Sequence, residues 1–169
     1  MLNEKLPVDP SAYAWIRGLD LLDTSFVLNL PCEDTGKKEK TLLHPEPVVL
    51  KPGMLGIISG KVDNNEDPFE TIKREALEEW ELDVDPSWIS NGLPRFSVKQ
   101  QRSGLNYNLE AIGHTLKLPY EKIVQLRAKT PVIEVGDEAL PRFLRENKKI
   151  LRPHVYLAGQ LILRRRQLS

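Results

Sequence analysis

The clearest hydrophobic pattern in the chain lies between residues 67 and 82. Apolar side chains recur there at helical spacing and fall within roughly 80° of one another around a helix axis, as in a stripe that packs on a core. Asp67 is a good N-cap residue, Pro68 suits the first helical position, and Glu70 stands three residues after the cap. The pattern therefore predicts an amphipathic helix that begins after Asp67. Its apolar stripe consists of Phe69, Ile72, Ala76 and Trp80.

The polar face of this helix is unusual because it carries three crowded carboxylates. Glu75, Glu78 and Glu79 fall within an arc of roughly 100°. Like charges at these spacings repel by a few tenths of a kcal/mol per pair, so the fold gains nothing from them unless a cation lies there. Hard divalent cations such as Mg²⁺ take oxygen ligands and share them between carboxylates, water and phosphates. The face is therefore a candidate metal site.

Strand and helix patterns alternate along the rest of the chain, without repeats. Residues 105–118 show the alternation of apolar and polar positions that is typical of a half-buried strand. Pro119 is expected to open a short helix that reaches about Lys129, and Pro153 a terminal helix. Residues 1–20 are interpreted as an N-terminal extension. The other strands are expected at 26–30, 48–50, 54–59, 95–101 and 132–135.

Composition and charge restrict the class of protein. A chain of 169 residues, 40% hydrophobic and 28% charged, fits one globular domain with a single substantial core. Lysine plus arginine and aspartate plus glutamate both number 24, so the net charge is zero and a broad surface for nucleic acid is not expected. The basic run 164–166 is interpreted as complementing the dipole at a helix end.

Cysteine content and hydropathy indicate the compartment. Cys32 is the single cysteine, so no internal disulfide is expected. Charged residues interrupt the first thirty positions, and nowhere do eighteen apolar residues follow one another. We therefore expect a cytoplasmic protein without a membrane partner.

The helix and the loop before it resemble the signature of the Nudix hydrolases, G-x5-E-x7-R-E-U-x-E-E-x-G-U, where U is a bulky aliphatic residue. The resemblance in detail covers about residues 54–84, with the signature itself at 60–82. It departs at one place, because Glu81 stands where the signature has its second glycine. Ala76 is a small substitute for the first U. The matching positions are Gly60, Glu66, Arg74, Glu75, Glu78, Glu79 and Leu82.

The resemblance implies an α/β/α sandwich with a mixed β-sheet, and a metal-dependent hydrolase of phosphoanhydride bonds. It implies that Mg²⁺ or Mn²⁺ is held by Glu78 and Glu79, with Glu75 as a further ligand or an activator of water. The backbone carbonyl of Ser59 would complete the metal shell. In the same scheme Arg74 orients the carboxylates, Glu66 braces the loop, and Gly60 lets the backbone approach metal and phosphate.

Members of the family often use one more acidic residue from a later loop, as a ligand or general base. Glu134, Asp137 and Glu138 lie in the segment where such a residue would come, and Glu134 is the favoured candidate. An exposed loop acid is an equally good interpretation of each.

The substrate is expected to be a small nucleoside diphosphate linked to another moiety, of the nucleotide-sugar or ADP-ribose type or a related nucleotide. Glu81 supports an alternative from another class, a catalytically weak module that binds nucleotides or regulates, because a drifted signature is what such a protein would show. Arg74 and the three carboxylates together favour catalysis. The resemblance also leaves a homodimer open.

Overall fold

A nine-stranded mixed sheet forms the centre of the computed structural model, which describes residues 7–167. Its main path runs β4 (His44–Val49), β3 (Lys38–Thr41), β7 (Ile89–Arg102), β8 (Leu105–Leu118), β1 (Val8–Gly18), β2 (Thr24–Asn29) and β5 (Leu55–Gly56). Two further strands branch from this path, since β6 (Ile58–Lys61) pairs with β1 and β9 (Val132–Gly136) pairs with β2. All of these pairings are antiparallel except that of β1 with β8.

Strand β1 lies in the middle of the sheet. It runs parallel to β8 along its whole length, and its other edge is shared by β6 and β2. The expected N-terminal extension over residues 1–20 is therefore wrong for 8–18. The sequence of this strand did not predict it for two reasons. A strand buried on both faces lacks the alternation of polar and apolar residues, and this one contains Pro10.

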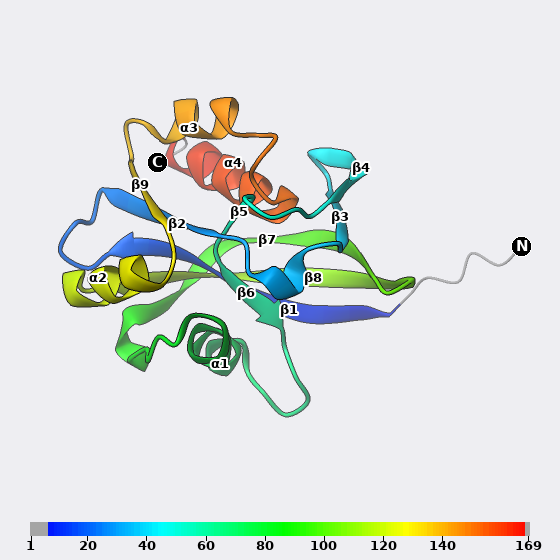
Figure 1. Ribbon diagram of the computed structural model, residues 1–169, viewed down its shortest axis with the longest axis horizontal. Helices are drawn as coiled ribbons and strands as arrows, with labels where there is room; N and C mark the ends of the chain where they lie inside the picture. Colours follow the sequence, from blue (N-terminus) through cyan, green and yellow to red (C-terminus); the bar gives the residue numbers. More distant parts are fainter. Residues whose placement is uncertain (1–6, 168–169) are drawn as a thin grey trace, which may run out of the picture.

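Helices cover both faces of the sheet, so the α/β/α architecture expected from the resemblance is confirmed (Figure 1). Helix α1 (Pro68–Trp80) and α2 (Tyr120–Lys129) contribute to one core, together with Ala14 and Ile16 of β1. Helices α3 (Leu140–Glu146) and α4 (Pro153–Gln167) contribute to the other, with Tyr13 and Trp15. Alternate side chains of β1 thus enter opposite cores.

Helix α1 begins as its sequence predicts, and it ends at Glu81 in the conformation that the glycine of the signature would favour. The Asp67 side chain accepts a hydrogen bond from the backbone N–H of Glu70 at 2.9 Å, which is the predicted N-cap. At the other end Glu81 adopts φ 53° and ψ 33°, the left-handed conformation that a glycine would favour. Leu82 then turns inward and is fully buried. The departure from glycine therefore leaves the helix exit unchanged.

The remaining elements follow the expected order, with shifts at their ends. Residues 105–118 form β8 as predicted, while the single strand expected at 54–59 is divided into β5 and β6. The strand expected at 95–101 begins earlier, as β7, after a short 3-10 turn, Pro86–Trp88. Within the described part of the chain, no helix is both long and apolar enough to span a membrane.

Candidate active site

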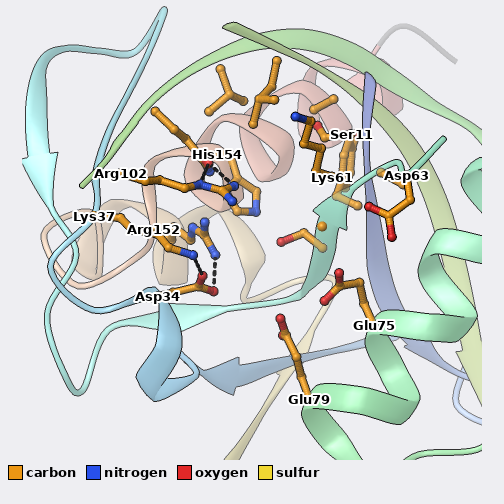
Figure 2. Close-up of a pocket in the computed structure, with 18 of the residues that line it drawn as sticks. Ser11, Asp34, Lys37, Lys61, Asp63, Glu75, Glu79, Arg102, Arg152 and His154 are labelled. Carbon is orange, nitrogen blue, oxygen red and sulfur yellow. Dashed lines mark hydrogen bonds and ion pairs between the residues drawn. The ribbon is translucent and has the colours of Figure 1, made fainter. Parts of the chain in front are cut away.

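A cavity of about 280 Å³ opens between α1, the loop after β6 and the sheet. Two carboxylates of α1, Glu75 and Glu79, point into it, and Ser59 and Gly60 of β6 form part of its lining (Figure 2). Strand β6 is held in place by β1, since Ser59 pairs with Tyr13 and Gly60 with Ala12. The fold thus brings the glycine and these two carboxylates of the signature into one site.

Gly60 and Glu75 lie in close contact. A Cβ atom on residue 60 would lie 2.3 Å from Oε1 of Glu75 and 2.4 Å from its carboxyl carbon. Its φ is not in the left-handed region, so close approach of Glu75, and not a special backbone conformation, demands glycine here. The glycine lets the carboxylate lie directly against the backbone of β6, where the whole Glu75 residue is only 8% exposed.

Glu79 lies next to Glu75 in the cavity. Burial, together with the neighbouring carboxylate of Glu75, raises the pKa of Glu79 to about 9. Asp34 across the cavity raises it further, and Arg152 opposes the change. Without a cation, this shift favours the protonated form of Glu79. A divalent cation between the two carboxylates would displace that proton.

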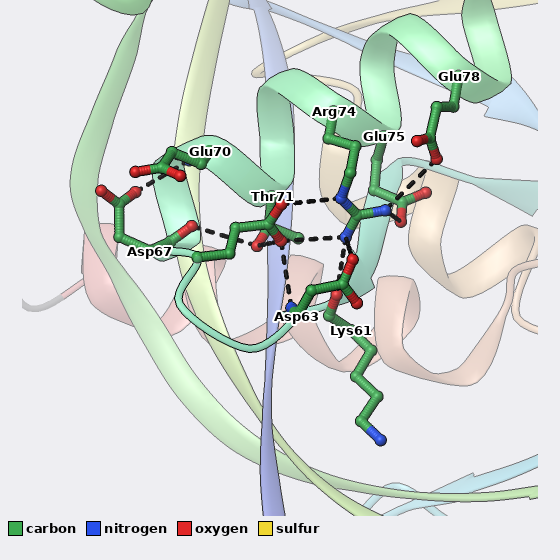
Figure 3. A network of polar contacts seen from close by, with 9 residues as sticks. Lys61, Asp63, Asp67, Glu70, Thr71, Arg74, Glu75 and Glu78 are labelled. Carbon is green, nitrogen blue, oxygen red and sulfur yellow. Dashed lines mark hydrogen bonds and ion pairs between the residues drawn. The ribbon is translucent and has the colours of Figure 1, made fainter.

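Arg74 joins the loop to the helix, as the resemblance implies (Figure 3). Its Nε and Nη2 donate to the two carboxylate oxygens of Glu66 at 2.8 and 3.1 Å, and Nη1 donates to Oε1 of Glu75 at 2.9 Å. Nη2 also donates to the carbonyl of Lys61 at 3.0 Å. These hydrogen bonds from Arg74, strengthened by one from Thr71, lower the pKa of Glu66 to about 2. Glu66 thus braces a permanently charged network.

Three predicted site residues lie outside the cavity lining: Glu66, which holds Arg74, and also Glu78 and Glu134. Glu78 is 61% exposed and faces Arg74, with Nη1 to Oε2 at 3.4 Å. Glu134 lies on β9, opposite Phe26 of β2, and forms an exposed ion pair with Arg127 at 3.0 Å. The structure therefore does not bring Glu134 to the carboxylates of α1, and nothing in its geometry supports its predicted role as ligand or general base.

The opposite side of the cavity holds functional groups that the sequence did not suggest. Arg152 reaches Oδ2 of Asp34 at 3.0 Å and the fully buried Glu39 at 3.0 Å. His154 contacts the same Glu39 through Nδ1 at 2.8 Å. The partners are more than a hundred residues apart, so no local spacing reveals them. We call the basic side chains that line the cavity on this side, Lys37, Arg102, Arg152 and His154, the cationic wall.

The donor set is suited to Mg²⁺ or Mn²⁺ with water and phosphate completing the coordination. Mg²⁺ is commonly bound through one or two carboxylates plus substrate phosphates, and Glu75 and Glu79 provide two. Within the described residues, no three His, Cys, Asp or Glu side chains form a ready metal cage. The elevated pKa of Glu79 and the Cβ-free surface at Gly60 both fit a cation at this place.

Comparison with known proteins identifies the fold. No protein-family model matches the sequence, and no curated protein does. Among solved structures, a MutT protein from Methanosarcina mazei Go1 superposes with a TM-score of 0.54 at 18% identity, covering 98% of this chain and 99% of that one. An Ap4A hydrolase from C. elegans has a TM-score of 0.51 at 13% identity, covering 96% and 98%.

A third neighbour, a NUDIX hydrolase from Nitrosomonas europaea, has a TM-score of 0.50 at 11% identity and covers 92% of this chain and 88% of that one. The chain therefore has the fold of the Nudix hydrolases, over nearly its whole length. In that fold, the residues of the signature lie on α1 and the loop before it, as described above.

Proposed function

We propose that this protein is a metal-dependent pyrophosphohydrolase that cleaves the phosphoanhydride bond of a nucleoside diphosphate linked to another moiety. The observation that carries the proposal is the packing of Glu75 against Gly60, with Glu79 beside it, at the edge of a cavity with cations opposite. Hydrolysis of a phosphoanhydride requires charge neutralisation and in-line placement of water more than covalent chemistry. This cavity offers groups of both signs for that purpose.

Each residue then has a defined task. Glu75 and Glu79 would hold the cation, with the backbone carbonyl of Ser59 and, from its exposed position, Glu78 as additional oxygen donors. A bound Mg²⁺ or Mn²⁺ neutralises phosphate charge and lowers the pKa of a coordinated water.

Arg74 keeps the Glu75 carboxylate in place, and Glu66 holds Arg74. Either Glu75 or Glu79, once ionised, can accept the proton of the attacking water.

The geometry of Glu81 favours catalysis over the alternative of a pure binding module. Its left-handed conformation reproduces the helix exit that glycine would give, and its backbone carbonyl accepts a hydrogen bond from Gln125 at 3.0 Å. The residue lies at the end of α1, outside the cavity lining. A signature that had drifted with loss of function has no reason to retain Arg74, Glu75 and Glu79 in this arrangement.

A substrate panel tests the proposal. Purified protein with Mg²⁺ or Mn²⁺ should release phosphate-containing products from at least one nucleoside diphosphate derivative, among nucleotide sugars and ADP-ribose. Glu79→Gln should reduce the rate by about 100-fold or more and leave the fold intact. Glu81→Gln should leave both the rate and the fold unchanged. Tight binding of one ligand with no turnover across the panel would instead establish a binding or regulatory module.

A further inference from the structure

The cationic wall is organised around one buried anion, Glu39. This side chain on β3 is 0% exposed, and it accepts hydrogen bonds from Nε of Arg152 at 3.0 Å, from Nδ1 of His154 at 2.8 Å and from Nε2 of Gln100 at 3.0 Å. The backbone N–H of His154, at the start of α4, donates a fourth at 2.8 Å. Burial alone would raise the pKa of Glu39, but Arg152 and His154 outweigh it and hold the pKa far below its usual range. Glu39 is therefore ionised.

Through Gln100 the same carboxylate also orients Arg102. The Gln100 amide nitrogen donates to Glu39, so its oxygen is free to accept from Nε of Arg102 at 3.0 Å. Arg102 lies over the ring of Tyr107, with 5.4 Å between the guanidinium carbon and the ring centroid. One buried anion thus fixes three basic side chains that line the cavity, Arg102, Arg152 and His154.

Among the residues of the cationic wall, His154 has a buried ring nitrogen without a hydrogen-bond partner in the described part of the chain. Its residue is only 4% exposed, and Nε2 is buried with no hydrogen-bond partner among the described residues. Because ionised Glu39 can only accept, Nδ1 carries a proton and Nε2 is the free position of the ring. A buried polar atom left without a partner is destabilising, and His154 lines the cavity (Figure 2). The missing partner is therefore expected from a ligand.

Resting on the proposed function, we propose that Nε2 of His154 donates a hydrogen bond to a phosphate oxygen of the substrate, on the side of the cavity opposite Glu75 and Glu79. The imidazolium form supplies that donor. Arg102 and Arg152 add positive charge beside it. Glu39 is then a positioning residue, which acts on the phosphate through His154, Gln100 and Arg152.

Binding of inorganic pyrophosphate to the metal-free full chain tests this inference without any catalytic turnover. His154→Asn keeps an amide donor near the position of Nδ1, and so the bond to Glu39, but removes the unpaired Nε2 nitrogen. We expect this variant to bind pyrophosphate about tenfold more weakly than wild type, by calorimetry. His154→Gln, which places an amide nearer to the position of Nε2, should recover part of the loss. His44→Asn, a matched change outside the cavity, should bind as wild type.

A spectroscopic readout on the wild-type protein needs no variant. Pyrophosphate should shift the ¹⁵N resonance of His154 Nε2, and leave that of His44 unmoved. The inference is overturned if wild type and His154→Asn bind pyrophosphate equally, if wild type does not bind it, or if the Nε2 resonance does not respond. Pyrophosphate binding that depends on His154, without hydrolysis of any substrate in the panel, would refute the proposed function and leave the inference standing.

Discussion

The two sides of the cavity are stabilised in opposite ways. On the α1 side, the cation Arg74 donates hydrogen bonds to Glu66 of the preceding loop and to Glu75 of the helix, and its own side chain is 25% exposed. On the other side an anion, Glu39, holds cations, and its side chain is fully buried. Glu75 and Glu79 thus lie on one side of the cavity, and Arg102, Arg152 and His154 lie on the other, as a metal–phosphate ligand requires. The difference in burial means that the cationic wall should be the more costly one to disrupt.

Removal of Arg152 should have the largest effect on stability. Arg152→Met would leave Glu39 buried with a reduced set of partners and would also break the ion pair with Asp34, so we expect a loss of about 3–5 kcal/mol in the free energy of unfolding, measured with urea. Lys37→Met, which removes the more exposed partner of Asp34, is the control and should cost less than about 1 kcal/mol. Equal losses of stability in Arg152→Met and Lys37→Met would show that the burial of Glu39 does not make the cationic wall the more costly side to disrupt.

Gly60→Ala should disrupt the carboxylate side by a smaller amount. The new Cβ would overlap the Glu75 carboxylate, so we expect a loss of about 1–3 kcal/mol. Gly136→Ala is a matched control, because a Cβ at that position meets no atom within 4 Å. Adding Glu75→Ala to Gly60→Ala should recover most of the loss in a double-mutant cycle. Additive effects would contradict the close packing of the two residues.

The pKa of Glu79 makes a prediction about pH. The native carboxyl keeps its proton up to about pH 9, whereas the unfolded chain releases it near 4.5, so the metal-free protein should lose stability as pH rises between these values. Glu79→Gln should remove this contribution and raise Tm at pH 8–9 by about 2–4 °C, seen by calorimetry in EDTA. Glu78→Gln, at an exposed position, is the control. An unchanged pH dependence in Glu79→Gln would contradict the shifted pKa.

Glu81→Gly should have the smallest effect. Glycine relieves the left-handed conformation but gives up the ion pair between Glu81 and Lys129 at 3.3 Å and adds freedom to the unfolded chain. We expect a net gain of at most about 1 kcal/mol and an unchanged hydrolysis rate. Glu81→Ala, which keeps the conformational cost, should gain nothing. A large increase in rate for Glu81→Gly would mean that the departure from the signature had disabled the site.

The sequence predicted one side of the cavity because that side is local. Glu75, Glu79 and Arg74 lie within five positions on one helix, and Gly60 lies on the strand that precedes it. The cationic wall could not be predicted, because β3 and the start of α4 meet only in the folded chain and neither carries a recognisable motif. The position of Glu134 relative to the cavity could not be predicted for the same reason, since it depends on the pairing of β9 with β2.

The central claim is that the carboxylates of α1 hold a divalent cation that meets a diphosphate. Titration of the metal-free protein with Mn²⁺, followed by electron paramagnetic resonance, tests it most directly. Wild type should bind Mn²⁺, with higher affinity when pyrophosphate is present, and Glu79→Gln should bind it at least about tenfold more weakly. Glu81→Gln, which removes a carboxylate of the same helix end outside the cavity, should bind as wild type. Equal Mn²⁺ affinity in wild type and Glu79→Gln would contradict the claim.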